Sequence, residues 1–279
     1  MNNQSPKSNR IAKVLSRSGV ASRRDAEKII LKGRVKVNGE ILTSPAFNVS
    51  ESDIILIDDN PIAKPEDDRL WCFHKPVGAI TTARDDKNRK TIYDYFPSSL
   101  PRMMPIGRLD INSEGLLLLT NSGELKRKLE LPSSQLGRIY RVRVKGQPKE
   151  SDLDLLRSGI SVEKDFFKPM KVSIDRQQGA NAWMTIEIKE GKNREIRRAL
   201  SEIGMQVNRL IRVEYGPFKL GNIKKGEIIE INKKSMRRSL KSVNINVARE
   251  NIRQSTEQKK FSAGSRLSLI HISEPTRPY

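Results

Sequence analysis

The sequence predicts an α+β protein, with a small N-terminal module of two helices and a short sheet ahead of a larger domain built on a mixed, mainly antiparallel sheet. Two observations support this. Near the N-terminus, apolar residues recur first at helical spacing and then alternate around an Asn-Gly pair. Further along, many short strand-like runs are separated by few charged helical segments, which is typical of α+β domains.

The N-terminal module is predicted to span residues 10–57 and to begin with two helices. Apolar residues at helical spacing over residues 11–15 predict the first helix, which Gly19 can end. The second helix begins at Ser22, which starts a capping-box-like segment, and Gly33 can end it.

A small sheet completes the module. Residues 35–41 alternate around Asn38-Gly39, a strong short-range signal for a hairpin, and residues 54–57 read as a further strand. Residues 58–68 are polar and contain two prolines, so they are predicted to form a linker.

Basic side chains crowd the helices and the first strand of the module, and few acids offset them. A surface of one sign is the electrostatic footprint of nucleic-acid binding, and a merely solvated surface is the alternative. The residues predicted to bind RNA here are Arg17, Arg23, Arg24, Lys28, Arg34 and Lys36.

Two segments of the module, residues 16–24 and 33–39, resemble the alpha-L motif of ribosomal protein S-four. The resemblance implies a domain that binds structured RNA, and by itself it implies no catalysis.

The larger domain is predicted to span residues 69–232. Its helices are expected at residues 124–131, around 153–156 and at 193–203. Its strands are expected at residues 70–73, 138–145, 169–174, 182–188, 205–213 and 227–231.

From residue 233 to residue 279 the chain is basic and polar, and it is predicted to be a disordered tail. Residues 264–279 change character again and resemble translated vector or adapter sequence. A native tail is the alternative for this last stretch.

The charge balance limits the class of partner. The chain has 53 Lys and Arg against 33 Asp and Glu, a formal charge of +20, which favours a polyanion such as nucleic acid. No apolar run approaches the roughly 20 residues that span a bilayer, and the N-terminus lacks the apolar core of a signal peptide. We therefore expect a cytoplasmic protein with no membrane partner.

Bound cofactors find little support in the sequence. A single cysteine and two histidines argue against a disulfide framework and against a zinc site. Neither a phosphate-binding Gly-Lys-Ser/Thr loop nor a Gly-x-Gly-x-x-Gly turn after a strand is present. The sequence therefore predicts no cofactor and no metal.

Asp110 is the first candidate for chemistry. It follows the short segment Gly107-Arg108-Leu109, lies in a turn rich in Asn, Ser and Gly, and precedes the apolar run 116–119. This arrangement holds a carboxylate rigidly at the rim of a core. An isolated Asp in a turn is more often a cap, so the surrounding pattern has to support the catalytic interpretation.

Two further candidates come from periodicity. Tyr140 shares a strand face with Val142 and Val144, and a core tyrosine is the equally weighted alternative. On the helix 193–203, about 100° per residue places Arg197 at the edge of the apolar stripe. Arg197 is therefore predicted to reach a partly buried acid. Arg194 and Arg198 are predicted to contact phosphate, although three exposed helix arginines are common.

The order of these segments resembles the rRNA pseudouridine synthases, in particular the family whose branches act on the small and the large ribosomal subunit. The family's second motif, Gly-Arg-Leu-Asp, Ser-Glu-Gly-Leu-Leu and Thr-Asn-x-Gly, matches residues 107–110, 113–117 and 120–123. Residues 191–198 resemble the third motif. Residues 75–78, with Thr81-Thr82, resemble the first, which is mainly structural in that family.

The resemblance implies isomerisation of uridine to pseudouridine within rRNA, with Asp110 as the essential catalytic residue. It implies that Tyr140 stacks on the target base and that Arg197 pairs with the acid. Arg108 directly precedes the acid and is expected to contact phosphate or help displace the base, with an ordinary surface arginine as the alternative. The resemblance is closest to the large-subunit enzymes, so 23S rRNA is the expected partner and 16S rRNA the alternative. The protein is expected to act as a monomer.

A non-catalytic RNA-binding or ribosome-associated protein is the main alternative, since it would share the charge and the N-terminal module. Simple binding has no need of Asp110, Tyr140 and Arg197 together. A methyltransferase would need a cofactor loop or a reactive Cys72, which lies inside an apolar strand.

Overall fold

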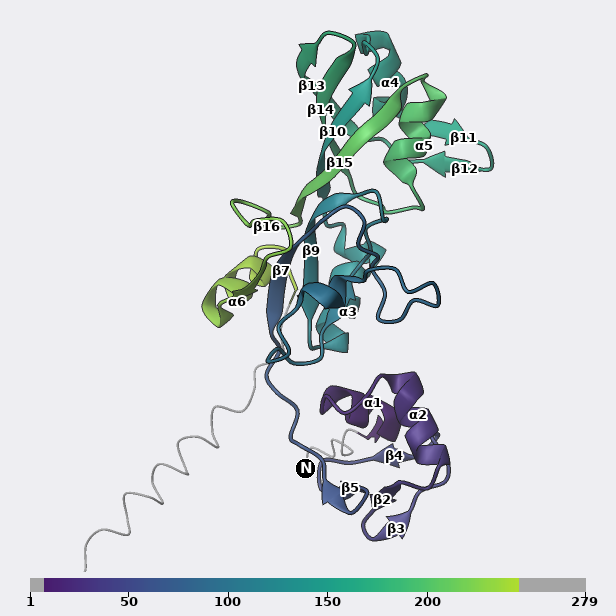
Figure 1. The fold of residues 1–279 in the computed structure, drawn as a ribbon, viewed down its shortest axis with the longest axis vertical. Helices are drawn as coiled ribbons and strands as arrows, with labels where there is room; N and C mark the ends of the chain where they lie inside the picture. The colour runs from purple at the N-terminus through teal and green to yellow at the C-terminus, as the bar shows by residue number, and fades with distance from the viewer. Residues whose placement is uncertain (1–7, 246–279) are drawn as a thin grey trace, which may run out of the picture. The chain divides into compact units, whose positions relative to one another are not determined.

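The computed structural model describes residues 8–245 of the chain (Figure 1). Its N-terminal module contains the helices α1 (Ile11–Arg17) and α2 (Arg23–Leu31). A sheet with strand order β3-β2-β5-β6 follows, formed by β2 (Val35–Val37), β3 (Glu40–Ile41), β5 (Ile55–Ile57) and β6 (Asn60–Pro61). A separate two-stranded pair joins β1 (Asn9–Arg10) to β4 (Asn48–Val49).

Local chemistry explains these boundaries. The Ser22 side chain accepts a hydrogen bond from the backbone N–H of Asp25, so the cap predicted for α2 is confirmed. Asn38 and Gly39 both adopt positive φ, at 52° and 92°, which is the backbone that a two-residue hairpin between β2 and β3 requires. The apolar stripes of both helices pack on the strands as one buried cluster.

The larger domain is built on a nine-stranded sheet with the main order β13-β14-β10-β15-β9-β7-β17. Only β9 and β15 pair in parallel among the described strands, so the predicted mixed, mainly antiparallel sheet is confirmed. The strands on the main path are β7 (Leu70–Lys75), β9 (Glu114–Thr120), β10 (Arg138–Lys145), β13 (Lys171–Gln178), β14 (Asn181–Ile188), β15 (Gln206–Tyr215) and β17 (Ile228–Ile231). Off this path, β8 (Met104–Ile106) pairs with β9, and β16 (Phe218–Lys219) pairs with β15.

Four α-helices and two short 3-10 helices are described in this domain. The α-helices are α3 (Gly123–Glu130), α4 (Glu150–Ser158), α5 (Glu195–Glu202) and α6 (Lys233–Lys241), and the 3-10 helices are η1 (Ile92–Tyr95) and η2 (Pro132–Ser134). A small hairpin of β11 (Ile160–Val162) and β12 (Asp165–Phe167), which was not anticipated from the sequence, lies between α4 and β13 in the chain. None of the helices described between residues 8 and 245 is long and apolar enough to cross a membrane.

Two apolar clusters lie on the two faces of the sheet. On one face, Leu117 and Leu119 of β9 belong to the cluster that includes residues of α4 and α5. On the other face, Leu116 and Leu118 pack with residues of α3 and α6. Because both faces are covered at β9, all seven of its residues are buried, and its centre, residues 116–119, is a continuous run of leucine.

The disorder predicted from residue 233 onward is wrong for residues 233–245. Asn232 caps α6 by accepting from the backbone N–H of Ser235, and Met236 and Leu240 of the helix are buried. These two apolar residues, four positions apart, are enough to anchor a helix whose remaining residues are mostly basic or polar. The remainder of the predicted tail, residues 246–279 with the unusual stretch 264–279, lies outside the described residues.

Gly115 permits the parallel pairing between β9 and β15. Its φ is +106°, and an added Cβ would lie 2.3 Å from the backbone oxygen of Arg212 and 2.7 Å from its backbone nitrogen. No side chain can move to relieve such an overlap, because both atoms belong to the backbone of the neighbouring strand. Glycine is therefore required at this point by two separate constraints, conformation and space.

We predict that Gly115→Ala destabilises the protein by more than about 2 kcal/mol, because backbone strain and a clash with β15 add together. The free energy of unfolding from urea titration measures the effect. Gly221→Ala is the matched control, since Gly221 also has positive φ (+54°) but its Cβ would meet no atom within 4 Å. Equal losses in the two variants would contradict the role assigned to the close approach.

Candidate active site

Asp110 lies on the loop that joins β8 to β9, two strands at the centre of the larger domain. The loop leaves β8 through Gly107, whose φ is +69° and whose backbone N–H donates to the Glu130 carboxylate at 2.6 Å. The neighbouring Leu109 is buried in the core, whereas the Asp110 side chain keeps 38% of its surface exposed. The carboxylate thus stands at the rim of the core, open to a ligand, as the sequence predicts.

Five successive backbone carbonyls, those of residues 109–113, each accept a hydrogen bond. The Thr81 hydroxyl donates to the carbonyl of residue 109 at 2.9 Å, and Lys75 Nζ donates to those of residues 110 and 113 at 3.0 and 2.9 Å. The backbone N–H of Gly78 donates to residue 111 at 2.9 Å, and Arg197 donates to residue 112 at 2.8 Å. The loop that carries the acid is therefore held along its whole length.

Lys75 is the central donor of this arrangement. Its side chain is fully buried, and Nζ also donates to the carbonyl of Pro76 at 3.1 Å. Three carbonyls use all three N–H groups of an ammonium, so the charged form matches the site. Burial lowers the pKa of Lys75 to about 8, and the negative charges of Asp110 and Glu114 act against that effect.

Two arginines flank Asp110. Arg194 Nη1 lies 3.9 Å from Asp110 Oδ2, with both side chains roughly half exposed. Arg197 forms no ion pair within 4 Å among the described residues and instead donates to the backbone carbonyls of Asn112 and Val207, at 2.8 and 3.1 Å. Burial lowers the pKa of Arg197, with a further contribution from Arg194, and the charge of Asp110 opposes this decrease.

The assignment of ion pairing to Arg197 from helical periodicity therefore differs from the observed geometry. The argument at 100° per residue applies inside a helix, and α5 begins only at Glu195. Arg194 is the residue before it and adopts a left-handed backbone, φ 49° and ψ 27°, which directs its side chain away from the helical pattern. Arg194 thus contacts the acid, and Arg197 holds the loop next to it.

Arg198, predicted to bind phosphate, is engaged elsewhere in the structure. It forms ion pairs with Asp165 at 2.6 Å and Glu163 at 2.9 Å, and it lies over the Phe167 ring at 5.0 Å. These contacts attach α5 to the β11–β12 hairpin. A phosphate contact by Arg198 would require breaking them.

Tyr140 lies in a row of residues that crosses five strands. In register order the row is Ile186 of β14, Tyr140 of β10, Arg212 of β15, Gly115 of β9 and Lys75 of β7. Tyr140 is buried in the cluster that also contains Val142 and Val144, so the face predicted for it is confirmed. Leu109, next to the acid, belongs to the same cluster.

The candidate RNA-binding side chains of the N-terminal module fall into two groups. Three form ion pairs with acids: Arg17 with Asp68, Arg34 with Asp58 and Lys36 with Asp59. The others are exposed, and they are Arg23, Arg24 and Lys28, the last 3.9 Å from Asp25. Arg108, beside the acid in the larger domain, is exposed too.

Glu114 was not singled out from the sequence as a buried charge. Its carboxylate is 1% exposed and pairs with Arg209 and, at 2.7 Å, with Lys225. Burial raises its pKa, but the hydrogen bonds and charges of the two cations outweigh this, so the net shift is downward. The sequence offered one signal for this buried charge: Glu114 lies just before the apolar run of residues 116–119.

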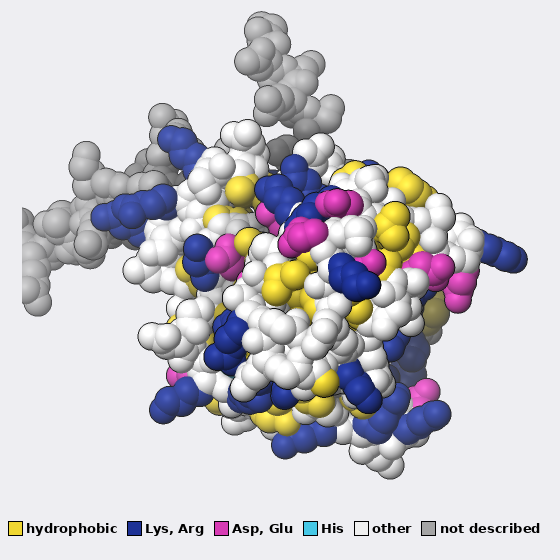
Figure 2. All heavy atoms as spheres, turned by 90° about the horizontal axis from the view of Figure 1, so that it is seen from above, with side chains coloured by type: hydrophobic (Ala, Val, Ile, Leu, Met, Phe, Trp, Pro, Cys, Tyr) yellow, Lys and Arg dark blue, Asp and Glu magenta, His cyan; other side chains and the backbone are white. Residues whose placement is uncertain are grey.

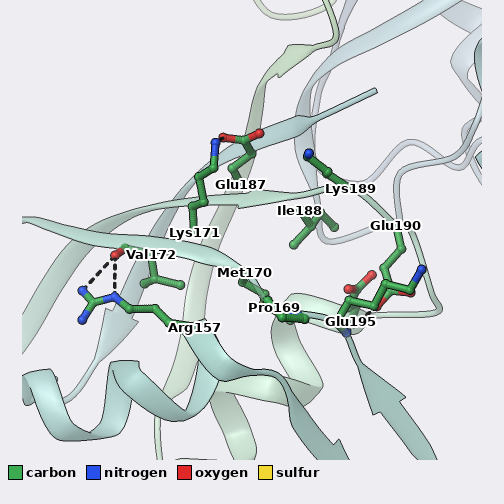
Figure 3. A pocket seen from close by; sticks show the side chains of 11 residues that line it. Arg157, Pro169, Met170, Lys171, Val172, Glu187, Ile188, Lys189, Glu190 and Glu195 are labelled. Carbon is green, nitrogen blue, oxygen red and sulfur yellow. Dashed lines mark hydrogen bonds and ion pairs between the residues drawn. The ribbon is translucent and has the colours of Figure 1, made fainter. Parts of the chain in front are cut away.

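Glu195, at the start of α5, was missed as well. It is 3% exposed and accepts from the backbone N–H of Lys192 at 2.9 Å. Figure 3 shows Glu195 and Glu190 side by side at a pocket of about 620 Å³. Burial raises the pKa of Glu195 to about 7, and Glu190 adds to the increase. Cys72 is also buried, which raises the pKa of its thiol to about 12 and agrees with an unreactive core residue.

Comparison with known proteins shows a consistent pattern. Residues 69–202 match the family model described as RNA pseudouridylate synthase, and residues 9–55 match the S4 domain. An uncharacterized RNA pseudouridine synthase of Rickettsia bellii is 48% identical over 228 residues, which cover 81% of this chain and 97% of the relative. Ribosomal large subunit pseudouridine synthase B of Bacillus subtilis is 38% identical over 232 residues, covering 82% and 94%.

A solved structure described as a crystal structure of pseudouridylate synthase is also similar. It superposes with a TM-score of 0.60 at 26% identity, covering 82% of this chain and 99% of that one.

We predict that Glu195→Gln removes a pH-dependent part of the stability. The folded pKa near 7 lies above the ordinary value of 4.5, so the folded protein holds this proton more tightly than the unfolded chain. The resulting stabilisation is present below pH 4.5 and is lost as the pH rises through 7. Over that window the free energy of unfolding of the wild type should fall relative to the variant, by at most about 1.4 kcal/mol per pH unit.

Urea titrations at several pH values measure this difference. Gln keeps an acceptor for the Lys192 N–H and carries no charge, so the fold should persist. Glu202→Gln, at the exposed end of α5, is the control and should follow the wild type at every pH. Parallel curves for Glu195→Gln and the wild type would contradict the raised pKa.

Proposed function

Since the chain belongs to the RNA pseudouridine synthase family, we propose that it converts uridine to pseudouridine in rRNA, with large-subunit 23S rRNA as its substrate. The S4 domain model at residues 9–55 and the names of the large-subunit relatives support this choice of RNA. We further propose that the protein acts in the cytoplasm as a monomer, on rRNA or on a ribosomal assembly intermediate.

The observation that carries the proposal is the placement of Asp110. A partly exposed carboxylate stands on a loop whose five carbonyls are all held, with a guanidinium 3.9 Å away. RNA binding alone requires neither a fixed acid nor a cation directed at it. A carboxylate held ionised in a fixed position is what nucleophilic or general-base catalysis requires.

The reaction moves the glycosidic bond of uridine from a ring nitrogen to a ring carbon without net loss of atoms. It needs no redox partner and no group donor. The target base first has to leave its stack and enter the site, which costs a few kcal/mol. Contacts to phosphates and stacking of the base on an aromatic ring, about 1–3 kcal/mol per base, offset that cost.

Asp110 acts by one of two routes. In the first, its carboxylate attacks the sugar as the bond to the ring nitrogen breaks, and the base then displaces it through a ring carbon. In the second, the carboxylate takes a proton from the sugar as the base leaves and returns it when the new bond to carbon forms. Arg194 places a guanidinium 3.9 Å from the carboxylate, where it can pair with the acid. Arg197 positions the loop through the carbonyl of Asn112. We assign to Tyr140, which is 8% exposed, the ring on which the extruded base stacks, and Arg108 is exposed for contact with phosphate.

We predict that Asp110→Asn lowers conversion by at least about 10³-fold, because amide and carboxylate have the same shape but the amide is neither a nucleophile nor a base. None of the hydrogen bonds described for this loop uses the Asp110 carboxylate, so the site should keep its form. Pseudouridine mapping at nucleotide resolution on unmodified 23S and 16S transcripts measures product, and filter binding measures affinity for RNA.

Affinity should remain within about threefold of the wild type, since Asp110→Asn removes one negative charge and no phosphate contact. Near wild-type conversion by Asp110→Asn would overturn the catalytic assignment. Binding without conversion by the wild type, on both transcripts, would instead favour a non-catalytic RNA-binding protein.

We also predict that the two arginines near Asp110 respond differently to lysine. At 3.9 Å a lysine ammonium can replace the charge of Arg194, so Arg194→Lys should keep most of the single-turnover rate while Arg194→Ala loses roughly tenfold. Arg197 spans two carbonyls with separate N–H groups, so Arg197→Lys should lose nearly as much as Arg197→Ala, up to about 10²-fold. Rescue of both positions by lysine would contradict the division of roles.

A further inference from the structure

We propose that this protein has a second RNA-binding surface, on the face of the sheet opposite Tyr140. This surface, called here the open face, binds the segment of the RNA chain next to the target uridine. The inference rests on the proposed function for the identity of that RNA. The open face consists of Arg141, Arg143, Lys145, Lys171, Asp175, Arg176, Trp183, Thr185, Glu187 and Arg209.

Strand alternation separates this surface from the site of Asp110. Along β10, Tyr140, Val142 and Val144 are buried in the core, whereas the residues between them are exposed. On β14 the even-numbered residues from 182 to 188 are buried, and the odd-numbered ones are only partly so. The basic residues of β10 and Trp183 of β14 therefore point away from the core that contains Tyr140.

The open face has no helical cover in the part of the chain that the structure describes. Apolar residues of α4 and α5 pack only into the cluster on the other face. Both helices lie on one side of β13, β14, β10 and β15 in Figure 1. Over β7 and β9 the corresponding face is covered by α3 and α6, so the sheet loses this cover where the basic residues begin.

An aromatic ring lies among the cations of this face. The guanidinium of Arg141 is 5.1 Å from the Trp183 ring centroid, and that of Arg209 is 5.9 Å from it. The two arginines come from strands β10 and β15, on the same side of the ring's own strand in the sheet order. Proteins bind single-stranded nucleic acid with this combination: positive charges contact the phosphates, and a partly exposed aromatic ring stacks on a base.

The charges of the open face do not cancel. Its two acids are already paired, Asp175 with Arg141 at 3.6 Å and Glu187 with Lys171 at 3.0 Å. Figure 3 shows the second pair pointing away from Arg157. Arg143, Lys145 and Arg176 have no acidic partner among the described residues.

Figure 2 looks down on the end of the molecule at the β13–β14 hairpin and shows Lys and Arg side chains around the visible surface, with smaller groups of Asp and Glu. Three unpaired cations beside an aromatic ring fit a phosphate backbone better than they fit a protein surface of mixed charge. RNA is therefore the occupant to which the charge points.

The test compares two double variants that each remove two positive charges. Arg143→Gln with Lys145→Gln neutralises the open face. Lys164→Gln with Lys168→Gln is the matched control, because both lysines are exposed in or just after the β11–β12 hairpin, which packs against α5. Affinity for a 23S rRNA fragment that includes the sequence flanking the converted uridine is measured by filter binding across a salt titration.

The open-face variant should bind about tenfold more weakly at low salt, and its log–log salt slope should be shallower by about one for each phosphate that is no longer neutralised. The control should match the wild type in both quantities. Trp183→Ala should weaken binding by roughly tenfold with no change in slope, and Trp183→Phe should recover most of that affinity. Thermal melting of each variant shows whether the fold is kept.

An open-face variant with the affinity and slope of the wild type overturns the inference. A variant that binds naked rRNA normally but no longer binds large-subunit precursor particles assigns the face to a ribosomal protein and also overturns it. Conversion of uridine by the wild type on the same fragment is scored separately. If the wild type does not convert uridine, the proposed function is contradicted. The comparison of salt slopes still decides whether the open face binds RNA.

Discussion

The structure of the site depends on the buried ammonium of Lys75. Three backbone carbonyls converge on it, and two of them, those of Asp110 and Ser113, lie at either end of the turn that carries the acid. A buried charge is tolerated only when it is fully hydrogen-bonded, and these carbonyls meet that requirement. In return the turn is fixed without any use of the Asp110 carboxylate, which stays free for chemistry. The Lys-Pro-x-Gly segment of the first motif and the Asp-bearing loop of the second are therefore one structural unit.

The same region is where the sheet changes character. β9 and β15 pair in parallel only near Gly115, the residue that allows two backbones to approach closely. On one side of this junction the sheet is covered on both faces, and on the other side it is covered only on the face that contains Tyr140. The residues that we propose for catalysis lie at this junction, where the loop after β8 enters β9 with its backbone carbonyls hydrogen-bonded. Rigid support of this kind limits the motion of a catalytic carboxylate.

Electrostatics divides the arginines at α5 into distinct roles. Arg194, outside the helix, contacts the acid across a partly exposed gap, and Arg197 is committed to two carbonyls. Arg198 joins the helix to the β11–β12 hairpin. Glu195 is buried beside Glu190; burial raises its pKa first, and Glu190 adds to the increase, while the charge of Lys192 acts in the opposite direction. The positive charges therefore fall into two groups: some cations are paired with acids, and others, such as Arg23, Arg24 and Arg108, are exposed without an acidic partner among the described residues.

Periodicity and local chemistry were sufficient to predict the main elements of this protein. The Ser22 cap, the Asn38-Gly39 turn, the alternation around Tyr140 and the apolar helix stripes depend on neighbours within a few residues, and so do the motifs around Asp110.

Tertiary structure decided the rest. The helix α6 exists because Met236 and Leu240 find a distant apolar surface, and Arg194 meets Asp110 because a left-handed residue turns it out of the helical pattern. Lys75 reaches carbonyls 35 and 38 positions away, and Gly115 is needed only because another strand passes close by. Contacts between residues far apart in the chain leave no periodic signal in either segment, so they can be seen only once the chain is folded.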